Sequence, residues 1–241
     1  REFLKGFQNS ANLAGQLRLQ GTMVGDTSGF VLSDATFLLD NFPEYGFQAG
    51  GWLNYRVSGE TGLELVANGE IASVSYLVDW LDLDLGELGA AQSNIRLTGS
   101  LDKPVIEAFS LTTGSAEGLT ININGRLNLY EARQDSESVE NTLMVEMQGP
   151  SLAVLRQWLG ELPYDTGPWR ASGQLSGYKD RLSLRDVAID AGTPDTMQLH
   201  ATGIVGSIHR AAETQQNYLF EDIDFRVEAH ARDSAALGAL L

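Results

Sequence analysis

This chain has no cysteine, only 6 prolines and no long apolar run. The absence of cysteine excludes disulfides, thiolate metal sites and cysteine nucleophiles. The absence of a long apolar run excludes a membrane-spanning helix, which needs about 18 or more such residues. Basic residues are also scarce, with 16 Lys and Arg against 32 Asp and Glu and a net charge of −16. This acidity disfavours nucleic acid and anionic headgroups as partners, and we interpret it as an aid to solubility.

The chain also lacks the motifs of common catalytic and metal sites. The three histidines, His200, His209 and His230, have no ligand partner three or four residues away, so we expect them to be solvent-exposed. The Asp-x-Asp-x-Gly of segment 82–86 lacks the later acidic ligands of a calcium loop. Segment 173–177 is not a nucleophile elbow, and no glycine-rich phosphate loop occurs. We predict no catalytic residue, no metal site and no cofactor; a glycan-active enzyme with two carboxylates is the least favoured alternative.

An internal repeat is the most informative feature that is present. Ser73 matches Ser151 at an offset of 78 residues, and Gly125 matches Gly203 at the same offset. Leu17-Arg-Leu-Gln-Gly21 matches Ile95-Arg-Leu-Thr-Gly99, also at 78. Self-similarity at a long period is typical of repeat architectures, in which each unit buries its apolar face only against its neighbours. We therefore predict one continuous array with units at residues 1–72, 73–150 and 151–232 and the start of a fourth at 233–241. We expect it to be an internal segment of a longer protein.

Each unit is predicted to contain one short helix and about four strands. Apolar residues recur with helical spacing over 74–81 and 152–159, and Ser73 and Ser151 stand where an N-cap is expected. Elsewhere apolar and polar residues alternate, which indicates strands with one apolar face and one wet face. Short turn sequences between the strands favour antiparallel hairpins. The alternating segments include 95–98, 119–124, 143–147, 197–202 and 223–227.

A sheet with one apolar face must either bury that face against other elements or keep it available to bind a ligand. The strand pattern by itself favours a sandwich or a closed barrel with a filled core. The alternative is an open, curved sheet that keeps its apolar face for a ligand, because one short helix is too small to cover four strands. Large exposed apolar surfaces usually mark binding sites.

Two segments resemble the AsmA family. One runs from Gly167-Pro-Trp-Arg-Ala-Ser-Gly-Gln-Leu-Ser-Gly177 through Leu182-Ser-Leu-Arg-Asp-Val-Ala-Ile189 to Gly203, preceded by Ser151-Leu-Ala-Val-Leu155 and Leu162-Pro163. The other, Leu97-Thr-Gly-Ser-Leu-Asp-Lys-Pro104, resembles the TamB branch of that superfamily. The resemblance covers nearly the whole chain but consists of short, degenerate pieces.

The resemblance implies a mainly β protein whose repeats form an open, curved antiparallel groove. It implies a periplasmic location with attachment to the inner membrane, and conduction of phospholipid toward the outer membrane along a hydrophobic groove. Protein partners in the periplasm or envelope are left unknown, and membranes would be contacted through segments absent from this chain. The alternative function is a structural or interaction β-repeat scaffold with a filled core. We expect the acyl chains to contact Leu97, Leu119, Ile121, Ile123, Val145, Leu175, Leu184, Ile189, Leu199 and Phe225.

Overall fold

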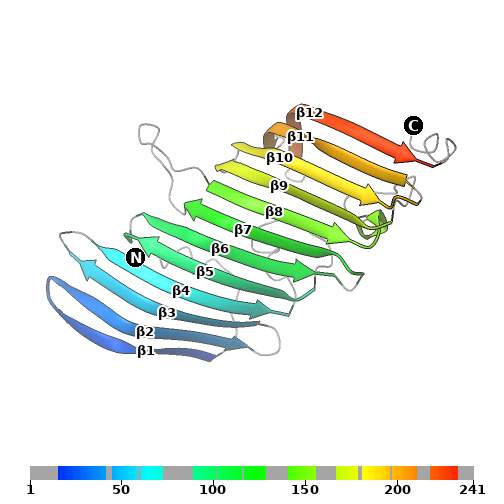
Figure 1. The fold of residues 1–241 in the computed structure, drawn as a ribbon. Coiled ribbons are helices and arrows are strands. Elements are labelled where there is room, and N and C mark those ends of the chain that lie inside the picture. The colour runs from blue at the N-terminus through cyan, green and yellow to red at the C-terminus, as the bar shows by residue number, and fades with distance from the viewer. Residues whose placement is uncertain are drawn as a thin grey trace.

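The protein is a mainly β structure built on a single open sheet of twelve strands (Figure 1). The computed structural model describes residues 16–41, 45–57, 59, 61–72, 89–101, 103–115, 117–128, 141–155, 167–178, 181–195, 197–210 and 218–232. All pairings are antiparallel, and each strand pairs with its neighbours in sequence from β1 to β12. The strands are β1 (Gln16–Asp26), β2 (Gly29–Asn41), β3 (Tyr45–Arg56), β4 (Gly62–Ile71), β5 (Ala91–Gly99), β6 (Pro104–Gly114), β7 (Thr120–Asn128), β8 (Asn141–Gly149), β9 (Trp169–Tyr178), β10 (Arg181–Gly192), β11 (Met197–Arg210) and β12 (Tyr218–Ala231).

Four strands fall within each of the three repeat units expected from the sequence. These are β1–β4, β5–β8 and β9–β12. The ends of β3, β7 and β11 lie at one rim of the sheet, and the ends of β4 and β8 lie at the opposite rim (Figure 1). This is the geometry of an up-and-down meander.

The prediction of one short helix per unit is not supported. In the described part of the chain, the helical structure is η1, a single turn of 3-10 helix at Leu152–Leu155. Ser151 Oγ accepts a hydrogen bond from the Ala153 N–H at 3.0 Å, which is the capping role predicted for Ser151. The helix expected over 74–81, the remainder of the one expected over 152–159, and the start of the fourth unit lie outside the described residues. Apolar spacing over one or two turns is weak support for a helix, because a nucleus that short gains few hydrogen bonds.

The strand register places most apolar strand residues on one side of the sheet. Residues that lie opposite each other in neighbouring strands share a face, as do alternate residues along a strand. The side that carries Leu65, Leu97, Leu143 and Leu175 is called the apolar face. Leu65 in β4 lies opposite Leu97 in β5, and Leu143 in β8 lies opposite Leu175 in β9. No described strand position on this face is charged in β1–β10, nor in β11 as far as Val205, nor in β12 from Ile223 onward. The other side, which we call the polar face, carries the charged and amide side chains.

Each unit bends along a line where a bulge meets a glycine. The second strand of each unit has a register irregularity, at Asp34 in β2, Glu107 in β6 and Asp186 in β10. The residue after each bulge region pairs with a glycine of the third strand, as in Phe109 opposite Gly125. A Cβ atom at Gly51, Gly125 or Gly203 would lie 1.9, 2.0 or 2.2 Å from a carbonyl oxygen of the fourth strand. Only glycine permits this close approach, and bulges with glycines are the usual means of curving a sheet.

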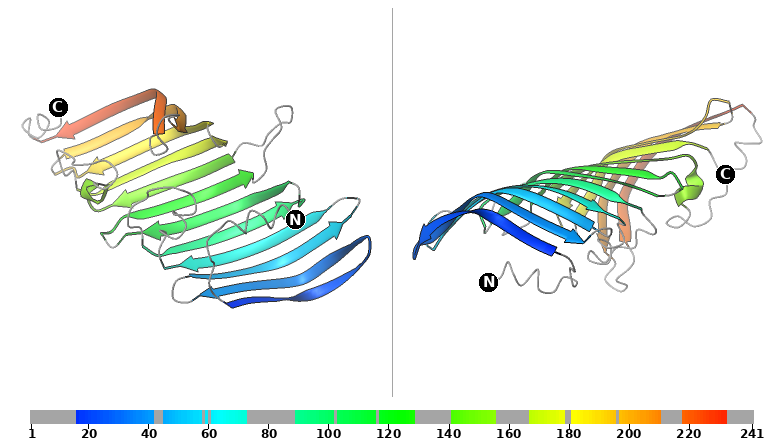
Figure 2. Two further views of the ribbon diagram at one scale, coloured as in Figure 1. Left: turned by 180° about the vertical axis from the view of Figure 1, so that it is seen from behind. Right: turned by 90° about the horizontal axis from the view of Figure 1, so that it is seen from below.

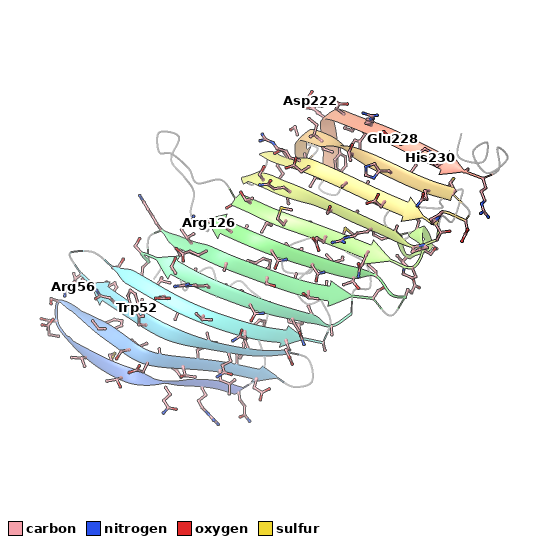
Figure 3. The ribbon with its side chains drawn as sticks, viewed as in Figure 1. Trp52, Arg56, Arg126, Asp222, Glu228 and His230 are labelled. Atoms are coloured by element: carbon pink, nitrogen blue, oxygen red, sulfur yellow. The ribbon has the colours of Figure 1, made fainter. Side chains whose placement is uncertain are left out.

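The resulting sheet is bowed, with the apolar face on its concave side. Figure 2 (right) shows the strands as arches and the ends of β11 and β12 bent toward the concave side. The polar-face residues Trp52, Arg126 and Glu228 lie on the convex side, from which Figure 3 is drawn. The curvature therefore partly encloses the apolar face along the length of the sheet.

The structure also corrects the alignment of the first unit. The sequence match placed Leu19 on Leu97, but the pairing partners show that Met23 is its equivalent: Met23 pairs with Leu32 as Leu97 pairs with Ile106. Leu32 and Ile106 both precede the bulge of their strand. A large apolar residue two places before a glycine occurs twice in β1, at Leu19 and at Met23, whereas the bulge marks one position.

Candidate ligand-binding face

The ten residues predicted to contact acyl chains all lie on the apolar face or directly continue it. Nine occupy apolar-face positions in β5 and in β7–β12, and Leu119 stands one residue before β7 with the parity of this face. The register thus places on one side of the sheet side chains that are more than 120 residues apart in sequence, such as Leu97 in β5 and Phe225 in β12.

Two of the ten are not available to a ligand. Leu119 is 1% exposed and Ile121 is 9% exposed, and both belong to a buried cluster with Val154 and Trp169. This cluster forms where η1 packs on the apolar face near the rim, and the Trp169 Nε1–H donates to Ser151 O at 2.9 Å. Alternation alone could not separate them from the rest, because burial by η1 depends on tertiary packing.

The other eight predicted residues are half-buried and retain accessible surface. They are Leu97, Ile123, Val145, Leu175, Leu184, Ile189, Leu199 and Phe225. A half-buried aliphatic side chain on a curved face can contact a ligand while its neighbours hold its position. These eight form the candidate ligand-binding face in β5 and β7–β12.

The structure extends this face to strands that the prediction left out. Phe37 in β2 and Tyr55 in β3 are each 38% exposed on the same side, and the Phe30 and Tyr55 rings contact each other with centroids 5.5 Å apart. The signal is present in the sequence on either side of the bulge at Asp34: Phe30 and Leu32 alternate before it, and Ala35, Phe37 and Leu39 alternate after it.

The polar face carries exposed ion pairs between neighbouring strands. Arg96 contacts Glu64 at 2.7 Å and Arg170 contacts Glu146 at 3.4 Å. Ion pairs of this kind contribute about 0–1 kcal/mol each at a solvated surface, so they add little to stability. On the same face, His200 Nδ1 and Asp190 Oδ1 share a hydrogen bond of 2.7 Å.

The turn between β1 and β2 contains hydrogen bonds to the Asp26 carboxylate. The Ser28 side chain and the Ser28 backbone N–H donate to Asp26 Oδ1 at 2.5 and 2.7 Å between β1 and β2. These hydrogen bonds lower the pKa of Asp26, because they favour its charged form. This turn is an Asx-type motif that directs the chain from β1 into β2.

Two shallow hollows lie on the polar face. One, of about 640 Å³, is lined by Val66, Arg96, Ala108 and Arg126 among others. The other, of about 500 Å³, includes His200, His230 and Glu228 (Figure 3). In the part of the chain that the structure describes, no three His, Asp or Glu side chains could hold a metal ion together.

The remaining sequence features are placed only in part. His200 and His230 are exposed, as predicted; the side chain of His209 and the segment 82–86 are not among the described residues. Ser176 is buried, and its hydroxyl shares a hydrogen bond of 3.1 Å with the Ser183 hydroxyl of the neighbouring strand. Among the helices described, none is long and apolar enough to cross a bilayer.

The candidate face therefore offers shape and apolar surface rather than reactive groups. In comparisons with known proteins, no family model, curated protein or solved structure matches this chain.

Proposed function

We propose that the apolar face binds the acyl chains of phospholipids and lets them move along the sheet, as part of a lipid-conducting groove. The observation that carries the proposal is the apolar face on the concave side of the twelve-stranded sheet, which has no charged position among the described strand residues as far as Val205 and Ile223. The resemblance to AsmA-like repeats adds support, and with it we propose a periplasmic location and attachment to the inner membrane in the full-length protein.

The physical argument rests on the cost of exposing lipid chains to water. Each methylene removed from water contributes about 0.8 kcal/mol. A phospholipid with two long chains therefore faces a high barrier to crossing an aqueous gap. A continuous apolar surface lowers that barrier along its length, while the headgroup stays hydrated at the open side.

The repeat architecture suits movement better than tight binding. Equivalent side chains recur in successive units, for example Leu65, Leu143 and Phe225, which all face a glycine of the third strand. Similar sites in sequence along a path have similar affinities, so no single site retains the ligand. No reaction is required, and we propose no enzymatic activity.

The experiment is native mass spectrometry of the purified chain with lipid extraction from the same sample, followed by uptake of a fluorescent phospholipid from vesicles. Val145→Asp and Leu199→Asp place a charge on the apolar face at half-buried positions. A buried charge near acyl chains is costly, so we expect both variants to lose most phospholipid uptake.

Matched controls come from the same strands. Met144→Asp in β8 and Ile204→Asp in β11 place the same charge on the polar face, where both side chains are 44% exposed. We expect these variants to keep uptake. Equal loss in all four folded variants, or a folded parent chain that carries no lipid and takes up none, would favour the alternative, a β-repeat scaffold.

A further inference from the structure

The two rims of the sheet differ in how deeply the apolar face is buried. We call wall rim the rim where β4 and β8 end (Figure 1). The apolar-face side chains at this rim are each between 1% and 5% exposed: Ile71, Ala91, Thr113, Leu119, Trp169, Ala191 and Met197. Gly149, at the end of β8, is also buried. A buried strip therefore follows the wall rim from β4 to β11.

Hydrogen bonds outside the strand pairs help to hold the wall rim. The Gly89 N–H donates to Gly114 O at 2.6 Å. The Thr113 hydroxyl donates to Ala90 O at 3.0 Å, so the residues before β5 are tied to the end of β6. Further along the same rim, η1 packs on Leu119 in the buried cluster. The wall rim is thus a packed part of the fold, and its apolar strip is shielded from water.

The opposite rim, where β3 ends and β4 begins, is more accessible on the same face. We call it the open rim. Tyr55 at the end of β3 is 38% exposed, and Leu127 in β7 and Leu182 in β10 are half-buried. Leu63 and Pro104 are the buried exceptions. Along most of its length, the open rim therefore combines apolar contact surface with access to water.

This asymmetry orients an amphiphile that lies on the face. Placing a polar group in a dry site without a hydrogen-bond partner costs about 1–3 kcal/mol, and a charged group costs more. Each methylene removed from water gains about 0.8 kcal/mol. Both effects act in the same direction, because the charged headgroup requires water and the chain ends avoid it.

We propose that a bound phospholipid lies across the sheet with its headgroup at the open rim and its acyl chains directed toward the wall rim. This inference rests on the proposed function, since it describes how the same ligand is oriented. In this orientation a lipid that moves from strand to strand keeps its headgroup in water throughout, and its chains stay on the apolar face.

Single cysteines at the two ends of β6 (Pro104–Gly114) test the orientation, because the chain has no cysteine of its own. Lys103 at the open rim and Glu117 at the wall rim are both exposed turn residues. The strand has 11 residues, so the two labels are on the order of 30 Å apart. Lys103→Cys and Glu117→Cys each carry a small fluorophore and are mixed with phosphatidylcholine vesicles that contain a nitroxide lipid.

We expect a nitroxide on the headgroup to cause loss of fluorescence at Lys103→Cys and to leave Glu117→Cys near its lipid-free value. A nitroxide at the end of an acyl chain should shift the ratio of quenching toward Glu117→Cys. Both labels lie outside the apolar face, so lipid uptake by the two variants should match the parent.

Native mass spectrometry of the labelled variants separates the two ways in which the proposal can fail. Bound lipid with equal headgroup quenching at both rims, with stronger quenching at Glu117→Cys, or with no quenching at either label overturns the orientation alone. Absence of bound lipid in both variants and in the parent chain overturns the proposed function and the orientation together.

Discussion

At the scale of single residues, three glycines decide where the sheet bends. Gly51, Gly125 and Gly203 lie where a carbonyl oxygen of the next strand occupies the place of a Cβ atom. The obstacle is backbone, so no side-chain rotation can relieve it. The same residue type recurs at the same place in each unit because the same close approach recurs.

We predict that Gly125→Ala destabilises the protein. A Cβ atom at Gly125 would lie 2.0 Å from Thr142 O and 2.8 Å from Leu143 Cα, so β7 and β8 must move apart. Forced overpacking costs about 1–3 kcal/mol. Urea unfolding followed by circular dichroism should show a lower midpoint than the parent chain.

Gly46→Ala is the matched control. No atom lies within 4 Å of a Cβ atom at Gly46, which is also in a strand of the same sheet. We expect its free energy of unfolding to stay within about 0.5 kcal/mol of that of the parent chain. Equal effects of the two substitutions would show that the close approach at Gly125 does not constrain the fold.

At the scale of elements, η1 separates the covered part of the apolar face from the accessible part. Its Val154 is buried with Leu119 and Ile121, and the Trp169 indole N–H holds the Ser151 carbonyl. One turn of 3-10 helix has too few internal hydrogen bonds to persist alone. Its position therefore depends on these contacts with the sheet.

We predict that Trp169→Phe loosens η1 while the sheet stays folded. The substitution keeps most of the buried aromatic surface but removes the 2.9 Å hydrogen bond to Ser151 O. The net loss should be about 1 kcal/mol. Hydrogen–deuterium exchange should accelerate at residues 152–154 and remain unchanged in β5 and β6. Uniform acceleration over all strands would instead mean that Trp169 stabilises the sheet as a whole.

At the scale of the whole molecule, the sheet has one layer and extends along its own hydrogen-bonding direction (Figures 1 and 2). Among the described strands, each is hydrogen-bonded to its neighbours in sequence, as the strand order shows. Stability is then the sum of local pairings, as in other repeat proteins.

We predict an elongated particle in small-angle X-ray scattering. Twelve strands spaced by about 4.8 Å extend over about 53 Å, and a compact chain of this length would have a radius of gyration of about 18 Å. Extrapolation to infinite dilution should give a clearly larger value for the monomer. A monomer of about 18 Å would mean that the sheet closes on itself in solution.

The sequence alone determined the alternation of apolar and polar residues, the four-strand period and the absence of reactive motifs. These properties depend on neighbours within a strand or on direct similarity between units, so they can be recognised without coordinates. Alternation also identified apolar-face members correctly, from Leu97 to Phe225, because a period of two assigns sides independently of how strands pair.

Only the tertiary structure decided the register, the burial and the curvature. Register in β1 depends on the bulge at Asp34 in the next strand, which the repeated pattern around Leu19 and Met23 does not reveal. Burial of Leu119 depends on a turn that begins more than 30 residues later in the chain. Curvature is a collective result of bulges and close backbone approaches aligned across several strands, and it places the apolar side chains on the concave side.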